Sequence, residues 1–281
     1  MFALTPGHAV AIAEGVWRLL ALNPGMMSGP GTNTYLISDD DGLLVLDPGP
    51  ADPRHIDNIL RTTDELQRPI KRILVTHTHR DHSPAVALLR EHVNAQVLGP
   101  ATVNDTLQDD SWAPQQVLAD GEQLDIGNGQ QLRVIATPGH VSNHLCYLHI
   151  QQQLLFSGDH LINGSTVVIA PPAGSMSAYL HSLRKLLDEP IAMIAPGHGD
   201  VLREPRTTIE ATIGHRLARE EKVWQALQSA PNGDANSLVA EVYRDVPAFL
   251  HPIAAYSLAA HLIKLVEDGR ATEQQGRYRV N

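Results

Sequence analysis

Four side chains that can bind a metal ion lie within six residues of this chain. The segment Thr76-His77-Thr78-His79-Arg80-Asp81-His82 follows an apolar run, residues 72–75, that is typical of a buried strand. Alternate side chains of an extended segment point to the same side, so His77 and His79 can hold one ion together. Asp81 and His82 follow where the chain bends into a helix, and this pair can face a second ion. The spacing therefore predicts a site for two metal ions.

Further side chains of the same types follow strand-like runs, each in a turn that contains glycine. They are His140 in Thr137-Pro138-Gly139-His140, Asp159 in Phe156-Ser157-Gly158-Asp159, and His198 in Ala195-Pro196-Gly197-His198-Gly199. Loops at the ends of rigid elements can bring such residues to a common rim. Three more polar residues are candidates for supporting the ligands or contacting a substrate: His144, His160 and Asn33.

The predicted ligands are imidazoles and carboxylates, without thiolates. Cys146 is the only cysteine, so no thiolate cluster and no intrachain disulfide can form. This donor set suits two zinc ions, and it also suits iron or manganese. Two cations sharing a water would lower its pKa to about 7 and generate a nucleophile without Ser or Cys. Asp81 is the candidate to orient the resulting hydroxide or to take its proton.

The elements that must position these residues alternate between short strands and helices, which predicts an α/β fold. Helices are expected at 53–67 and at 84–92, the second with Ser83 as N-cap and Pro84 at its first position. After Gly199 the composition changes. The spacing predicts helices over 207–229, 237–244 and 253–267, followed by a ribbon that includes 277–280. We therefore expect a hydrolase domain over 1–205 and a helical, winged-helix-like domain over 206–281.

The order His-x-His-x-Asp-His, then His, Asp and His, resembles the metallo-beta-lactamase superfamily over about residues 16 to 205. The resemblance implies a four-layer αββα sandwich with its metals at one edge of the two sheets. It also implies a distribution of the ligands: His77, His79 and His140 on one ion, Asp81, His82 and His198 on the other, and Asp159 bridging both.

Within that superfamily, two branches are similar to this chain. The beta-lactamase-like protein 2 family is similar through residues 31–37, 76–83 and 257–265, and its animal members are endoribonucleases acting on single strands. This chain differs from that family by Ser83-Pro84-Ala85, where Ser-Gly-Gly is usual, and by His160 after Asp159. Residues 137–147 are similar to glyoxalase II, a thioester hydrolase.

Three functions remain open on the sequence alone. The first is hydrolysis of ester-like bonds in a small molecule, namely a thioester, lactone or aryl ester. The second is a single-strand endoribonuclease, and the third is a regulator that binds DNA through the C-terminal domain. The net charge of −10 and an aromatic content of 4% favour the small molecule, since binders of single strands use basic grooves and aromatic stacking. Basic residues in the tail alternate with acidic ones, which disfavours a DNA-reading surface.

The chain shows no sign of a membrane or secretory segment. Its N-terminus lacks a basic start with an apolar stretch, so we expect a cytoplasmic location. No stretch approaches the roughly 20 uninterrupted apolar residues of a membrane span. The oligomeric state is left open, with a homodimer among the alternatives.

Overall fold

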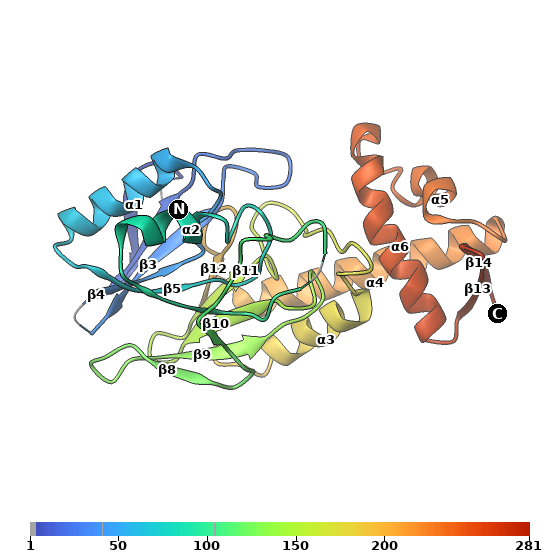
Figure 1. The fold of residues 1–281 in the computed structure, drawn as a ribbon. Helices are drawn as coiled ribbons and strands as arrows, with labels where there is room; N and C mark the ends of the chain where they lie inside the picture. Colours follow the sequence, from blue (N-terminus) through green and yellow to red (C-terminus); the bar gives the residue numbers. More distant parts are fainter. Residues whose placement is uncertain (1–3, 41, 104) are drawn as a thin grey trace. The chain divides into compact units, whose positions relative to one another are not determined.

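A computed structural model describes residues 4–40, 42–103 and 105–281 of the chain (Figure 1). The chain divides into two compact units, which are described separately. The first comprises residues 1–137, 143–166 and 190–205, and the second comprises 138–142, 167–189 and 206–281. The boundary predicted between 205 and 206 stays a prediction.

The first unit contains a seven-stranded sheet whose strands follow one another in sequence order. Its strands are β1 (Ala9–Ala13), β2 (Val16–Leu20), β3 (Asn33–Asp39), β4 (Gly42–Leu46), β5 (Ile70–Leu74), β6 (Gln96–Gly99) and β7 (Gln116–Val117). The first four strands pair antiparallel, and from β4 to β7 the pairing is parallel. The parallel part needs crossover connections, and these supply two helices.

A five-stranded sheet with the order β12-β11-β10-β9-β8 completes the strands of this unit. Its members are β8 (Gln123–Asp125), β9 (Gln131–Ala136), β10 (Leu145–His149), β11 (Leu154–Gly158) and β12 (Met193–Pro196). Only the pair of β11 and β12 is parallel among the described pairings of this sheet. The carboxyl ends of these two strands therefore lie side by side.

The two sheets of the first unit enclose a shared core. Leu44 and Leu46 of β4 pack in one cluster with Tyr147 and Phe156 of the second sheet. Val45 points to the opposite face and packs with the helices α1 (Pro53–Glu65) and α2 (Ala85–His92). This alternation is the period of two expected for a strand that is buried on both faces. In Figure 1 both helices lie on one side of the β3–β5 sheet.

The two helices of the first unit begin differently. The side chain of Asp52 accepts a hydrogen bond from the backbone N–H of Arg54 and caps α1. For α2, the prediction that Ser83 is the N-cap is wrong, because Pro84 occupies that position without a side-chain bond. The hydroxyl of Ser83 instead donates to Asp109 Oδ2 at 2.7 Å.

The second unit is mainly helical and has its own core. It contains α3 (Met176–Leu186), most of α4 (Pro205–Ser229), α5 (Ala235–Val242), a 3-10 turn (Ala248–Leu250) and α6 (His251–Glu267). A two-stranded ribbon, β13 (Ala271–Gln274) with β14 (Arg277–Val280), follows α6. Side chains from α4, α5, α6 and the ribbon form one apolar cluster. Three helices and a β-ribbon agree with the expected winged-helix arrangement.

Helix α6 supplies four of the twelve buried side chains described for this second core. Together with the preceding turn, residues 248–267 are long and apolar enough for a membrane span by length and composition, with a mean hydropathy of 1.4. The core helix of a soluble protein passes the same test, and Leu258, Leu262 and Leu265 are fully buried within the unit. These leucines therefore belong to the core, whereas Phe249, Tyr256 and Ile263 of the same segment are exposed.

Candidate metal centre

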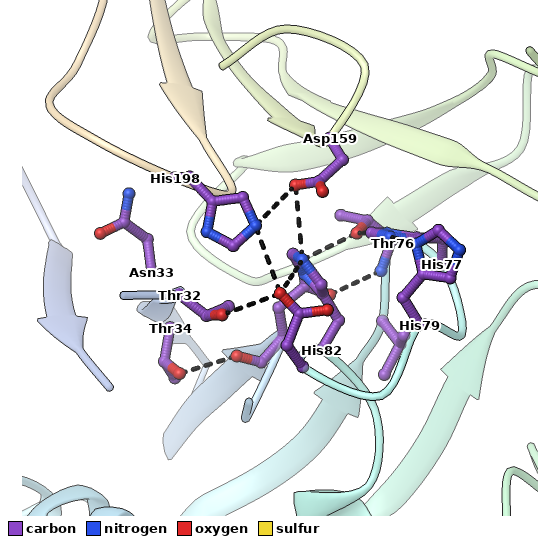
Figure 2. A network of polar contacts seen from close by, with 12 residues as sticks. Thr32, Asn33, Thr34, Thr76, His77, His79, His82, Asp159 and His198 are labelled. Atoms are coloured by element: carbon purple, nitrogen blue, oxygen red, sulfur yellow. Dashed lines mark hydrogen bonds and ion pairs between the residues drawn. The ribbon is translucent and has the colours of Figure 1, made fainter. Parts of the chain in front are cut away.

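The predicted ligands of the first unit lie together beyond the ends of three strands. His77 and His79 follow β5, Asp159 follows β11, and His198 follows β12. Because β11 and β12 are parallel, with Gly158 opposite Pro196, the residues after their ends are neighbours. Figure 2 shows Asp159 between His198 on one side and His77 and His79 on the other.

The distances between ligand atoms fit a shared cation. His198 Nε2 lies 3.3 Å from both Asp81 Oδ2 and Asp159 Oδ1, and His82 Nε2 lies 3.4 Å from Asp159 Oδ1. Two atoms bound tetrahedrally to zinc at 2.0–2.1 Å are about 3.3–3.4 Å apart. His77, His82 and Asp159 form one group of potential ligands, and Asp81, His82 and His198 form another. The donor set and its spacing therefore fit metal binding.

The tautomer of His77 is determined by a chain of hydrogen bonds. The Thr76 hydroxyl donates to Asp47 Oδ2 at 2.7 Å, so its oxygen accepts from His77 Nδ1 at 3.0 Å. The proton on Nδ1 leaves the lone pair on Nε2, which is the nitrogen a metal needs. The Nε2 atom accepts from His79 Nδ1 at 3.0 Å.

The rings of His82 and His198 are oriented in the same way. His82 Nδ1 donates to Asp47 Oδ2 at 3.0 Å, and His198 Nδ1 donates to the carbonyl of Gly31 at 3.1 Å. In both residues Nε2 is then the nitrogen directed at the carboxylates. His82 Nε2 is buried and makes no hydrogen bond of its own among the described residues. A metal ion bound there would satisfy this nitrogen.

Asp81 is the more accessible of the two carboxylates. Its side chain is 32% exposed, whereas that of Asp159 is 11% exposed. The hydroxyl of Thr32 donates to Asp81 Oδ2 at 3.4 Å. Asp81 can therefore face a ligand or a water while it remains within reach of His198.

Opposite charges control the protonation of this cluster. Burial lowers the pKa of His198, but Asp159 and Asp81 outweigh it and raise that pKa to about 10. Burial raises the pKa of Asp81, but His82 and His198 outweigh it and lower that pKa to about 2. Burial, followed by the charges of His82 and His79, holds the pKa of His77 well below its usual range. Without ions, protons on His82 and His198 supply the positive charge that cations would provide.

His140 lies in the second unit, on the short segment 138–142. Its Nδ1 donates to the carbonyl of Val168 at 2.7 Å, which leaves Nε2 as the lone-pair nitrogen. As in His77, His82 and His198, Nδ1 is therefore the nitrogen that donates a hydrogen bond within the chain. Its assignment as a ligand stays a prediction.

The three supporting candidates occupy different places. His144 accepts from the backbone N–H of Asp159 at 3.2 Å, and its Nδ1 donates to Thr137 at 2.8 Å, so it supports Asp159. Asn33 donates to the carbonyls of Pro196 and Gly199 at 2.9 and 2.8 Å and holds the His198 loop from both sides. His160 is fully buried, with its ring 5.9 Å from that of His144.

Sequence reasoning missed a buried ion pair that supports the His198 loop. Arg18 is 1% exposed, and its guanidinium donates to Asp200 Oδ1 at 2.9 Å. The available signal was a lone arginine within the apolar strand β2. Since an unpaired buried charge is costly, such an arginine indicates an acidic partner elsewhere in the chain.

Comparisons with known proteins agree with this fold and site. A family model described as the metallo-beta-lactamase superfamily matches residues 28–198. A second model, described as a beta-lactamase associated winged helix domain, matches residues 235–278. The chain therefore belongs to the metallo-beta-lactamase superfamily, and its α/β sandwich with a C-terminal winged helix is confirmed.

Individual relatives extend along most of the chain. A beta-lactamase-like protein 2 homolog from Drosophila melanogaster is 32% identical over 281 residues, covering 95% of this chain and 93% of that protein. The thioesterase pkgB from Emericella nidulans is 31% identical over 237 residues, covering 82% of this chain and 66% of that protein. The crystal structure of a beta-lactamase domain protein from Burkholderia ambifaria has a TM-score of 0.84 at 22% identity, covering 99% of this chain and 95% of that one. The predicted resemblance to the beta-lactamase-like protein 2 family is confirmed.

Proposed function

We propose that this chain is a binuclear metal-dependent hydrolase that cleaves an ester-like bond, a thioester, lactone or aryl ester, in a small molecule. The observation that carries the proposal is the spacing of 3.3–3.4 Å between Nε2 atoms and carboxylate oxygens at His82, Asp159 and His198. The similarity to a thioesterase along 82% of the chain supports the substrate class.

The ligand assignment that we propose divides the residues between two ions. His77, His79 and His140 hold one ion, Asp81, His82 and His198 hold the other, and Asp159 contacts both. Zinc is the preferred metal, with iron and manganese as alternatives for the same donors. When bound, such ions acidify a water and polarise a carbonyl or phosphoryl oxygen. The hydrogen bonds at Nδ1 of the histidines direct Nε2 to this role.

Asp81 has a second role in the proposal, because its partly exposed carboxylate can orient the attacking water and accept its proton. Asp81→Ala separates this role from ligation when metal content and turnover are measured independently. We expect turnover to fall by at least about 100-fold, the usual contribution of a positioned acid or base, even at metal concentrations that restore full occupancy. Unchanged turnover at full occupancy would show that Asp81 takes no part in the reaction.

The charges of the second unit favour a small molecule over RNA, the alternative substrate. Arg219 and Lys222 pair with Asp245 at 2.8 and 3.0 Å, and Lys264 pairs with Glu220 at 3.1 Å. These cations are offset by carboxylates, and affinity for a nucleic acid depends on cations that remain available to phosphates. The winged-helix match is the observation that keeps a single-strand endoribonuclease as the second candidate.

The deciding experiment measures turnover of the metal-loaded protein on a thioester, a lactone, an aryl ester, a phosphodiester and a single-stranded RNA. We expect hydrolysis of at least one ester-like substrate, lost on chelation and restored by the metal. RNA cleavage lost on chelation, without turnover of any ester, would reverse the order of the two candidates. A wild-type protein that binds no divalent ion would overturn both.

A further inference from the structure

A short segment of the second unit is held by two helices that are distant in sequence. Arg216 of α4 donates to the carbonyl of Val167 at 2.5 Å. Ser257 of α6 accepts from the backbone N–H of Ile169 at 3.1 Å. Residues 167–169 belong to no helix or strand, so these two bonds replace the regular pairing that would otherwise fix the segment.

Arg216 and Ser257 are called the two anchors of this segment. Val168, the residue between their two contacts, orients a predicted metal ligand. The carbonyl of Val168 accepts from His140 Nδ1 at 2.7 Å. This bond determines both the tautomer of His140 and the rotation of its ring. A shift of the segment would therefore move the acceptor and release the ring.

The backbone around His140 is fixed independently by α3. Gly139 has a φ of 142°, and a Cβ there would lie 2.3 Å from the backbone of Tyr179, so no other residue fits. The N–H of Ser175 donates to the carbonyl of Gly139, and the hydroxyl of Ser182 donates to that of Pro138, both at 2.8 Å. These contacts hold the main chain beside His140 independently of residues 167–169.

Both anchors are buried, which makes their bonds strong determinants of position. Arg216 is 2% exposed and Ser257 is 5% exposed. The guanidinium of Arg216 also lies over the ring of Tyr179, 5.3 Å from its centre, and this contact helps to fix the position of the Arg216 side chain. Losing either side chain would leave a buried backbone group without its hydrogen bond, which is unfavourable.

We propose that Arg216 and Ser257 are positioning residues for the metal ligand His140. They act through the segment 167–169, whose central carbonyl holds the imidazole with Nε2 as the ligand nitrogen. The inference rests on the proposed function, since that is what assigns His140 to an ion. It gives α4 and α6 a part in orienting this predicted ligand.

The test compares two variants with a control from the same helix. Arg216→Met and Ser257→Ala each remove one anchor. Arg219→Met removes an arginine of similar burial, three residues along α4, that donates to the carbonyl of Val242 instead. Metal-free proteins are titrated with Co²⁺ while the visible absorption of the bound ion is recorded. The imidazole ¹⁵N spectrum of each metal-free protein reports the tautomer of His140.

We expect both anchor variants to bind one of the two ions about tenfold more weakly, the lower end of the range for lost outer partners of metal ligands. The other ion should keep its affinity, and the His140 signals should show mixed tautomers. Arg219→Met should lose thermal stability but bind both ions as the wild type does. Unchanged Co²⁺ affinities and an unchanged His140 spectrum in both anchor variants would overturn the proposal.

Failure of the proposed function gives a different result. In that case the wild-type protein itself would take up fewer than two Co²⁺ ions. The imidazole spectrum of the metal-free proteins still tests the positioning role, because it requires no bound ion. If Arg216→Met does not fold, Ser257→Ala removes the second anchor without removing a charge.

Discussion

At the scale of single residues, one carboxylate connects the two groups of ligands. Asp47 accepts from the backbone N–H and the hydroxyl of Thr76, both at 2.7 Å, and from His82 Nδ1 at 3.0 Å. Thr76 in turn accepts from His77. Asp47 therefore fixes the tautomers of His77 and His82 together.

Replacing this carboxylate by an amide tests its role. Asp47 has a φ of 50°, a conformation that asparagine tolerates well, so Asp47→Asn should keep the backbone. The amide NH₂ only donates hydrogen bonds, so it cannot replace Asp47 Oδ2 as the acceptor for Thr76 and His82. We expect metal affinity to fall by about 10–100-fold. Competition with a chromogenic chelator measures this. Asp52→Asn, at the cap of α1, is the control, and equal affinities in the two variants would contradict the prediction.

Some of the site residues could be recognised in the sequence because their pattern is local. His77, His79, Asp81 and His82 lie within six residues, and the rule that alternate side chains share a side is sufficient to group them. Thr32 and Arg18 could not be assigned, since their partners Asp81 and Asp200 are 49 and 182 residues away. Their roles depend on which strands become neighbours.

At the scale of elements, the turn after β12 is closely packed against the turn after β11. A Cβ at Gly197 would lie 2.5 Å from Asp159 Oδ1 and 2.9 Å from His82 Cε1. The absence of a side chain at this position lets the two turns approach. Only glycine allows His198 and Asp159 to converge here.

The substitution Gly197→Ala should therefore displace Asp159 and reduce the metal content below two ions per chain, measured by elemental analysis. Gly214→Ala is a matched control, because a Cβ there meets nothing within 4 Å in the middle of α4. We expect that control to keep its metal and to gain about 0.5–1 kcal/mol of stability, as alanine replaces glycine in a helix. Full metal occupancy in Gly197→Ala would disprove the steric argument.

Helices α4 and α6 are joined by Glu220, which lies near His261 and Lys264. Burial raises the pKa of Glu220, but hydrogen bonds and charge from His261 and Lys264 outweigh it and lower the pKa below 4.5. The stabilisation from Glu220 is thus present above about pH 4.5 and is lost as the pH falls through the lowered pKa.

Glu220→Gln should therefore unfold at a lower temperature than the wild type at pH 7, and the difference should shrink below about pH 4.5. Glu221→Gln is the control, because Glu221 is 49% exposed and its ion pair with Arg270 contributes little. Thermal unfolding followed by circular dichroism between pH 3 and 7 measures both. A difference from wild type that does not change with pH would contradict the assignment.

Element prediction from sequence succeeded where local patterns determine structure and failed where a tertiary contact competes. A helix over 253–267 was expected from its apolar spacing, and α6 (His251–Glu267) forms there. Ser83 was expected to cap α2, but its hydroxyl bonds to Asp109 on a different segment. A side chain that can satisfy either a helix end or a distant carboxylate cannot be assigned from its neighbours in sequence.

At the scale of the whole molecule, metal binding should stabilise the folded chain. An ion at 100 times its Kd contributes about 2.7 kcal/mol, which corresponds to roughly 5–10 °C in Tm for a chain of this size. Adding a chelator should lower Tm by that amount, measured by calorimetry. His82→Ala should show a smaller response to the chelator. An unchanged wild-type Tm would contradict metal binding in the folded state.

The sequence predicted the types and order of the elements better than it predicted which strands pair with one another. Alternating strands and helices up to residue 137, and three helices with a ribbon after Gly199, were sufficient to expect an α/β fold and a winged-helix-like domain. The four-layer sandwich was expected from the resemblance to the metallo-beta-lactamase superfamily. The sequence did not predict the sheet pairing that places β12 beside β11, because the 34 residues 159–192 separate these two strands. The position of His198 depends on that pairing.

The bond between Arg18 and Asp200 also has a consequence for how the protein matures in a cell. A chain is synthesised from its first residue, so strand β2 is made long before the loop that its arginine must hold. The His198 loop can reach its folded position only after about 180 further residues have been added. Contacts between residues so far apart in sequence form slowly during folding. A nascent chain interrupted before Asp200 would therefore carry His77 and His79 without the ion pair that holds the His198 loop.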